Sequence, residues 1–187
     1  MTGLTALWIP IVVSAVLVFV ASSIIHMLLH AWHKSDYRKV PDEEKLRDLV
    51  RPLALPPGDY MVPLPSSMAE MKTPEFAEKM RQGPVMILTV MPNGAMTMGK
   101  SLSLWFAYCL VIGILSAYVA GATLAPGAGH LRVFQISGAT AFIAYSAALW
   151  QMSIWYHRDW GTTIRCTIDG LIYSLVTAAA FCWLWPT

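Results

Sequence analysis

The stretch that decides the fold is Ile24–Lys39, which reads IIHMLLHAWHKSDYRK. Its first half ends a long apolar run, and its second half is abruptly charged. An apolar run of about 20 residues is long enough to cross a bilayer as a helix. The stretch therefore predicts the end of a membrane-spanning helix and the start of a segment that lies in water.

Four apolar runs of this length occur along the 187-residue chain. They comprise residues 7–29, 101–122, 133–154 and 164–185. Charged residues make up only 13% of the sequence, whereas a soluble domain carries about 25%. We therefore expect an all-α integral membrane protein, a bundle of four transmembrane helices with a cytosolic insertion, residues 30–100, between the first two helices.

The basic residues are distributed unevenly. Ten of the thirteen lie in residues 34–100, two flank the loop between the third and fourth runs, and one, Arg132, lies in the loop before it. Cytosolic loops are enriched in Lys and Arg, so residues 35–100 are predicted to be cytosolic and both termini external. The layout is similar to that of many small bacterial inner-membrane proteins. Tryptophans predict an interfacial belt on each side: Trp8, Trp183 and Trp185 outside, and Trp32, Trp105, Trp155 and Trp160 inside.

The insertion is predicted to contain two short helices joined by an extended segment. The first helix begins near Pro41 and ends at Val50, before an Arg-Pro pair. The second begins after Thr73 and stops at Gly83. The segment between them carries prolines at 52, 56, 57, 63 and 65, which exclude a regular helix.

A small β-hairpin is the other predicted element of the insertion. The apolar residues 84–91 and residues 95–98 flank Asn93-Gly94, a dipeptide that favours tight hairpin turns. We expect these two segments to pair with each other.

Asp169 is the sharpest single candidate for function, because it lies inside the fourth apolar run. An acidic residue within a membrane helix needs a partner and is a functional candidate. Arg165 precedes it by one helical turn, and His26 and Gln151 fall at a similar depth in other helices. We predict an intramembrane polar cluster of Asp169, His26, Arg165 and Gln151, which either locks the bundle together or carries chemistry.

The histidines of the opening stretch are candidate metal ligands. His26, His30 and His33 have spacings of four and three, which places them on one face of a helix. His157 and Asp159 lie at the cytosolic end of the third helix and add two possible ligands on the same membrane face. Membrane di-iron oxidases and desaturases hold metal in histidine-rich cytosolic clusters, which this set approaches only in part. The alternative is an ordinary helix end at the headgroup level.

Other chemistries lack their sequence signals. The chain has no P-loop, GxGxxG, GxSxG, HExxH or CxxCH motif, so the sequence specifies no cofactor. The net charge of +2 does not indicate a nucleic-acid partner. The methionine-rich insertion suits either Cu(I) or adaptable apolar packing. We interpret Cys109, Cys166 and Cys182 as packing thiols, because no CxxC spacing is present.

Small residues recur at four-residue spacing in two of the predicted helices. They are Gly113, Ala117 and Gly121 in the second helix and Gly170, Ser174, Ala178 and Cys182 in the fourth. Such rows let helix backbones approach closely, either inside one bundle or across a homodimer.

Two functions stay open at this point. We expect a small polytopic membrane protein that serves as a non-enzymatic accessory or scaffold subunit, with its cytosolic segment docking a partner in a larger membrane complex or homodimer. The alternative is a metal-dependent membrane enzyme or metal-binding protein that uses the histidine and aspartate residues of the cytosolic face.

Overall fold

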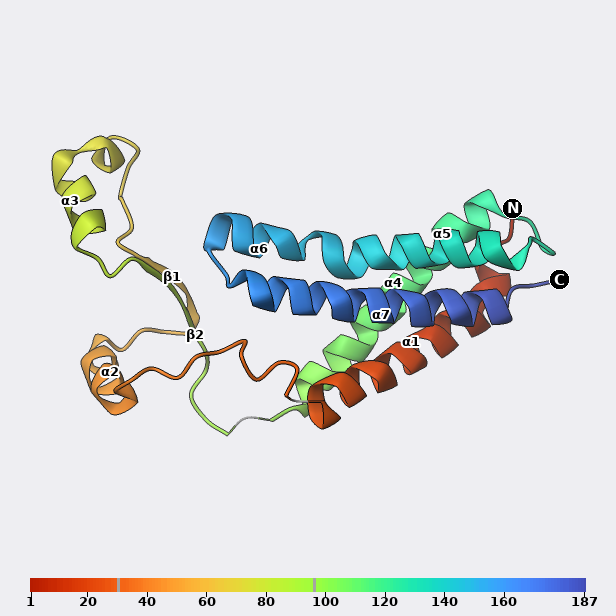
Figure 1. Cartoon of the computed structure of the whole chain (residues 1–187), viewed down its shortest axis with the longest axis horizontal. Helices are drawn as coiled ribbons and strands as arrows, with labels where there is room; N and C mark the ends of the chain where they lie inside the picture. The colour runs from red at the N-terminus through yellow and green to blue at the C-terminus, as the bar shows by residue number, and fades with distance from the viewer. Residues whose placement is uncertain (30, 96) are drawn as a thin grey trace. The chain divides into compact units, whose positions relative to one another are not determined.

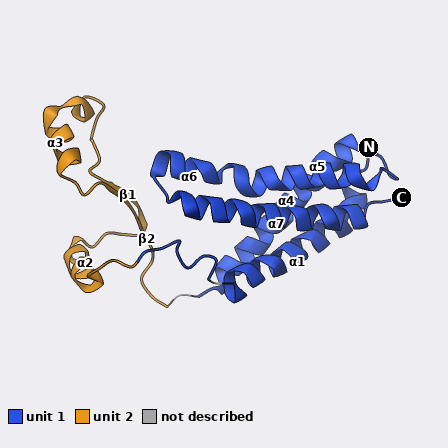
Figure 2. Cartoon of the chain, viewed as in Figure 1, with its two compact units in different colours: residues 1–38, 97–187 blue, residues 39–96 orange. Residues whose placement is uncertain are grey.

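The structure is a computed structural model that describes residues 1–29, 31–95 and 97–187. These residues form two compact units, residues 1–38 with 97–187 and residues 39–96 (Figure 2). Among the described residues, four helices are long and apolar enough to cross a membrane, as predicted (Figure 1). They are Leu4–Leu28, Gly99–Thr123, His130–Tyr156 and Trp160–Trp183.

The first unit contains these four long helices, and two of them include a π-helical segment. The first helix consists of a 3₁₀ turn, η1, the α-helix α1 and the π-helical η2, while the third consists of α5, the π-helical η5 and α6. Their bounds are η1 Leu4–Leu7, α1 Trp8–Ser23, η2 Ile24–Leu28, α4 Gly99–Thr123, α5 His130–Phe142, η5 Ile143–Ala147, α6 Leu149–Tyr156 and α7 Trp160–Trp183.

The four long helices contact one another in a closed ring. α1 contacts α4 and α7, and α5 contacts the same two helices. The buried core has two parts, one around Leu7, Val133 and Phe181 and one around Val18 and Tyr173. Both parts combine residues from the first and last helices of the unit, so the bundle depends on contacts between distant segments of the chain.

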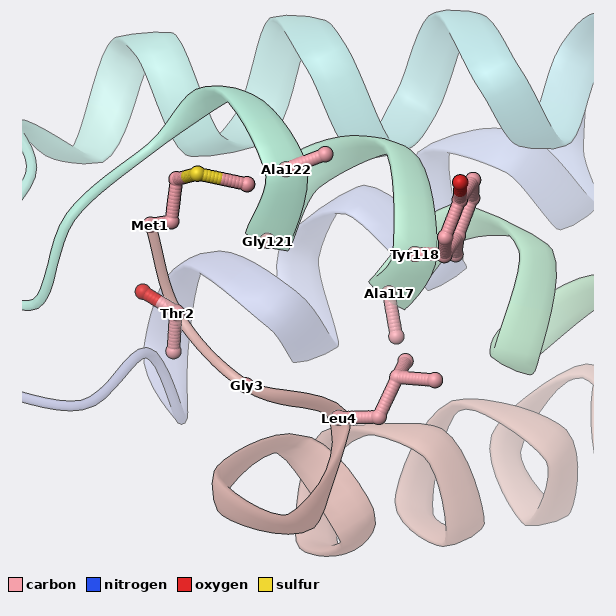
Figure 3. A pocket seen from close by; sticks show the side chains of 8 residues that line it. All are labelled: Met1, Thr2, Gly3, Leu4, Ala117, Tyr118, Gly121 and Ala122. Carbon is pink, nitrogen blue, oxygen red and sulfur yellow. The ribbon is translucent and has the colours of Figure 1, made fainter.

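The rows of small residues face neighbouring helices inside this bundle. A Cβ atom added at Gly113 would lie 3.2 Å from the carbonyl oxygen of Ile11 on α1. At Gly121 it would overlap the carbonyl oxygen of Thr2, whose chain runs beside α4 and lines a cavity of about 430 Å³ with it (Figure 3). At Gly170 it would overlap the hydroxyl of Ser146 in η5. Of the two interpretations of these rows, the contacts at Gly113, Gly121 and Gly170 support packing within one bundle.

The second unit contains the two short helices predicted in the insertion, α2 (Glu43–Val50) and α3 (Pro74–Gln82). Asp42 caps α2 by accepting a hydrogen bond from the backbone N–H of Lys45 at 3.1 Å. Thr73 caps α3 in the same way through the N–H of Phe76 at 3.2 Å, and Gly83 ends α3 with φ +58°. The predicted limits of α3 are confirmed, and α2 ends at Val50 as predicted but begins at Glu43, two residues after Pro41. The unit also has two 3₁₀ turns, η3 (Arg51–Leu53) and η4 (Glu70–Lys72).

The predicted hairpin is wrong in its pairing. β2 (Met86–Val90) pairs antiparallel with β1 (Gly58–Val62), which lies in the proline-rich segment, with Gly58 opposite Val90. β1 contains no proline, so each of its residues keeps a backbone N–H for the ladder. The Thr89 hydroxyl also donates to Asp59 across the strands at 2.7 Å. The second half of the predicted hairpin, residues 95–98, includes Met96, which lies outside the described residues.

Candidate functional site

The chain after η2 turns rather than continuing as a helix, and this turn builds the site. The backbone N–H of Trp32 donates to the carbonyl of Leu29 at 2.8 Å, and that of Asp36 donates to the carbonyl of His33 at 3.0 Å. His26 and His33 therefore do not share a helix face as predicted. Their rings instead stack with centroids 4.5 Å apart. The third histidine of that prediction, His30, lies outside the described residues.

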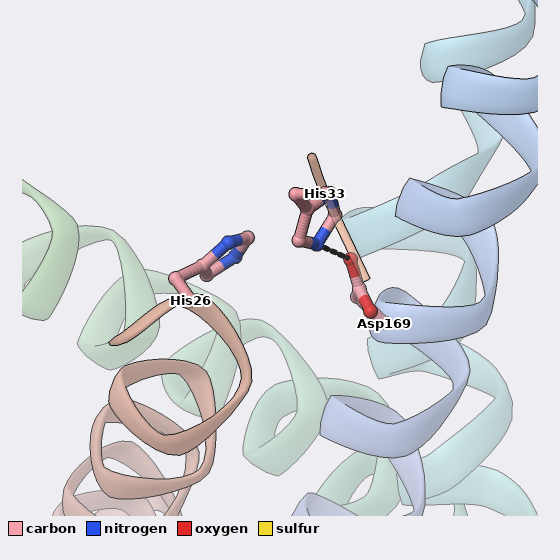
Figure 4. Close-up of side chains that lie close together, drawn as sticks. All are labelled: His26, His33 and Asp169. Carbon is pink, nitrogen blue, oxygen red and sulfur yellow. Dashed lines mark ion pairs between the residues drawn. The ribbon is translucent and has the colours of Figure 1, made fainter. Parts of the chain in front are cut away.

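Asp169 of α7 lies at the centre of the site. It is 3% exposed, and its Oδ1 accepts a hydrogen bond from Trp32 Nε1 at 3.0 Å. Its Oδ2 lies 2.9 Å from His33 Nε2 (Figure 4). Neither predicted partner, Arg165 or His26, is bonded to it directly, because the turn brings Trp32 and His33 onto its two oxygens. The buried acid thus has partners, but from a segment more than 130 residues away.

Arg165 pairs with Asp36 and not with Asp169, its predicted partner. Arg165 donates to Asp36 Oδ1 through Nε at 2.8 Å and through a terminal nitrogen at 2.6 Å, and Asp36 Oδ2 lies 2.7 Å from His33 Nδ1. Burial alone would raise the pKa of the Asp36 carboxyl. The hydrogen bonds from His33 and Arg165 and the charge of Arg165 outweigh it, so this pKa lies below its ordinary value. Asp36 is therefore an anion at neutral pH.

The cluster is thus a continuous chain of polar contacts from Arg165 through Asp36 and His33 to Asp169. His26 lies at its edge, where its Nε2 is 3.3 Å from the hydroxyl of Tyr173. One ring nitrogen of His26, one of His33 and a carboxylate oxygen of Asp169 all lie within 4.8 Å of one another (Figure 4). Two imidazoles and a carboxylate are a set of ligands that transition metals bind.

Three residues predicted for the site lie elsewhere. Gln151 is exposed on α6, so it does not join Asp169. His157 is exposed at the end of α6 in a left-handed conformation, with φ 53°. Asp159 caps α7 by accepting from the N–H of Thr162 at 3.2 Å. In the break between the two helices, His157 therefore ends α6 and Asp159 caps α7.

Sequence analysis missed two residues of the cluster, Asp36 and Trp32. Trp32 was assigned to the interfacial belt, where a ring N–H usually faces lipid headgroups or water. The His33-x₂-Asp36 spacing was the available signal for Asp36, since residues three apart can meet in a turn.

Comparison with models of protein families, with curated proteins and with solved structures finds no match for this chain.

Proposed function

We propose that the chain is an integral protein of the bacterial cytoplasmic membrane, with both termini outside and residues 35–100 in the cytosol. Support for insertion comes from the outer faces of the long helices. In the most apolar stretch of each of the first three, only 28% of the residues are buried. Val16, Val111 and Leu175 are each more than 40% exposed, which is favourable in lipid and costly in water. The distribution of Lys and Arg supports the orientation.

We further propose that His26, His33 and Asp169 bind a divalent transition-metal ion. The observation that carries this proposal is the contact between His33 Nε2 and Asp169 Oδ2. The two atoms are 2.9 Å apart, yet among the described residues the buried Nε2 has no partner aligned for a hydrogen bond. Two ligand atoms bound to one ion at 2.0–2.1 Å and at right angles are about 2.9 Å apart, and each directs its lone pair at the ion.

The groups around these ligands have the arrangement that metal sites require. His33 Nδ1 faces Asp36 at 2.7 Å, and a histidine that donates one ring N–H to a carboxylate presents its other nitrogen as a lone pair. Arg165 holds Asp36 in place, and Trp32 holds one oxygen of Asp169. His33 and Asp169 are therefore oriented before any ion binds.

The charge of the cluster also favours a cation. With neutral imidazoles, Asp36 and Asp169 contribute two negative charges and Arg165 one positive charge, which leaves a formal charge of −1. Three protein ligands from two histidines and one carboxylate suit Zn²⁺ or Fe²⁺ and leave coordination positions open. Open positions are typical of metals that bind or activate a further molecule rather than metals that only stabilise a fold.

Metal analysis of the full-length protein tests this proposal. We expect about one zinc or iron per chain in protein purified in detergent without chelators, and loss of that metal in His33→Ala. Asp36→Asn removes no ligand and should weaken binding by about 10- to 100-fold. His157→Ala is the matched control, because that histidine is exposed outside the cluster. A parent protein that holds no metal and takes up neither added Zn²⁺ nor added Co²⁺ overturns the proposal.

The accessory role is the second candidate, and exposed side chains of residues 39–96 favour it. Phe76 is the one large apolar side chain that is buried in the described part of that unit. Leu49, Leu64, Met68 and Met91 are each more than 60% exposed, so large apolar side chains of this unit are available to contact a partner. The protein purified in detergent for metal analysis also separates the two functions, through its metal content and its native size. A metal-free protein that runs as part of a larger native complex favours the accessory role.

A further inference from the structure

A cavity of about 220 Å³ adjoins the cluster. Its walls include the rings of Trp105 and Tyr108 from α4, Tyr145 from η5 and Tyr173 from α7. His26 and Asp169 also line it, so two of the three proposed metal ligands lie in its wall. A molecule in the cavity would therefore touch the same groups that would hold the ion.

The four rings support one another. The ring centroids of Trp105 and Tyr173 are 5.9 Å apart, those of Tyr108 and Tyr145 also 5.9 Å, and those of Tyr145 and Tyr173 5.5 Å. Edge-to-face contacts at these distances are favourable and fix the orientation of each ring. The walls are thus ordered without a ligand.

Most polar atoms of these rings are already bonded to the protein. Trp105 Nε1 donates to Ser22 Oγ at 2.8 Å, the Tyr108 hydroxyl donates to the carbonyl of Ala144 at 3.1 Å, and the Tyr173 hydroxyl lies 3.3 Å from His26 Nε2. The walls therefore offer mainly apolar ring surface to an occupant. The polar groups left for it are the Tyr145 hydroxyl and those of the metal cluster.

The two π-helical segments found among the described residues both border this cavity. η2 carries His26 and η5 carries Tyr145. A π-helical turn widens the helix by one residue at a cost in hydrogen-bond geometry, and such turns are frequent at functional sites. Both irregular turns therefore shape the walls of the same cavity.

We propose that this cavity binds a segment of the acyl chain of a membrane lipid and presents it to the metal held by His26, His33 and Asp169. The proposal rests on the proposed function, and it names the class of molecule that the site would accept. Tyr108, at the edge of the cavity, is 42% exposed on a spanning helix, where exposed side chains contact lipid chains. The volume is smaller than the roughly 300–1,000 Å³ of sites for whole small molecules, so part of a chain is the fitting occupant.

Photolabelling in a bilayer tests the proposal. The full-length protein is placed in nanodiscs that contain a phospholipid with a diazirine in its acyl chain, and labelled residues are mapped by mass spectrometry. We expect more label on Tyr108 and Leu149, which line the cavity, than on Leu115 and Leu175, each 47% exposed on the outside of the bundle. Equal labelling of the two groups overturns the proposal.

Two variants of Leu149 make the test specific. Leu149→Trp fills the cavity and should reduce its labelling by roughly tenfold, because an added ring removes the space that the chain needs. Leu149→Ala enlarges the cavity and should preserve or increase labelling. Leu175→Trp is the matched control and should leave the labelling of Tyr108 and Leu149 unchanged. Unchanged cavity labelling in a folded Leu149→Trp protein contradicts the lipid site.

Metal content, measured on the same samples, separates the two proposals. Bound metal without enriched labelling contradicts the lipid site alone. Enriched labelling that responds to Leu149→Trp, in a protein that binds no metal, contradicts the proposed function alone and leaves a lipid-binding cavity.

Discussion

At the scale of single residues, Asp169 has the most demanding environment. Its carboxylate is almost fully buried, and its stability there depends on Trp32 and His33. A buried carboxylate without partners would be strongly destabilising. The same environment supports two roles, a structural anchor for the turn after η2 and a metal ligand, and substitutions at this position separate them.

Asp169→Leu should destabilise the protein by about 3–5 kcal/mol, because it leaves buried partners of the carboxylate uncompensated. Asp169→Asn should cost less, since the amide oxygen still accepts the hydrogen bond from Trp32. The measurements are folded yield in detergent and metal content beside the parent. A purely structural role predicts that the Asn variant keeps both, whereas a ligand role predicts normal folding with loss of metal. If Asp169→Leu equals the parent in both, the site proposed here is wrong.

At the scale of elements, the bundle depends on close approach between α7 and η5. A Cβ atom at Gly170 would overlap the Ser146 hydroxyl and lie 3.3 Å from the Cβ of Tyr145. The hydroxyl can rotate away, but the Cβ of Tyr145 is fixed to the backbone. The contact therefore tolerates one added carbon far better than a branched side chain.

Gly170→Leu should lower the thermal stability in detergent more than Leu171→Ala does. Overpacking of a tight contact typically costs about 1–3 kcal/mol, whereas Leu171 is 44% exposed and its truncation leaves the bundle interior unchanged. Gly170→Ala should fall between the parent and Gly170→Leu. A milder effect of Gly170→Leu than of Leu171→Ala would mean that this face of α7 contacts lipid.

At the scale of the whole molecule, the four long helices and the 39–96 unit call for different surroundings. The outer faces of the helices are apolar, and the 39–96 unit contains most of the charged residues. The proposed orientation, with residues 35–100 in the cytosol, would satisfy both, and it would put twelve of the thirteen basic residues on or near the cytosolic side.

Cysteine labelling tests this orientation. In a background without the native cysteines, Thr187→Cys should react with a membrane-impermeant thiol reagent in intact cells, and Ser67→Cys should react only after the cells are opened. Both positions are exposed in the structure, so access depends on the membrane alone. Labelling of position 67 from outside would reverse the predicted topology.

Local patterns in the sequence were enough to predict the long helices and the two short ones. Length and hydropathy mark the first group, because a helix that faces lipid must be apolar along about 20 residues. Helix-end signals mark the second group: Thr73 acts on a backbone group only three residues away, and Pro41 and the Arg-Pro pair after Val50 flank the other short helix. Each of these signals is contained within the element that it predicts.

Pairing between distant segments was decided only by the tertiary structure. β2 pairs with β1 and not with the nearer residues 95–98 as predicted. The carboxylate of Asp169 contacts Trp32 and His33 and not Arg165 in its own helix. Asp169 was recognisable from the sequence because a charge in an apolar run is conspicuous. The partners of Asp169 were not recognisable, because they depend on where the chain turns after Leu28. The sequence spacing of the histidines is equally compatible with a continued helix. The free energy of a buried charge is set by the groups that surround it in space, so only the folded chain determines which residues form the site.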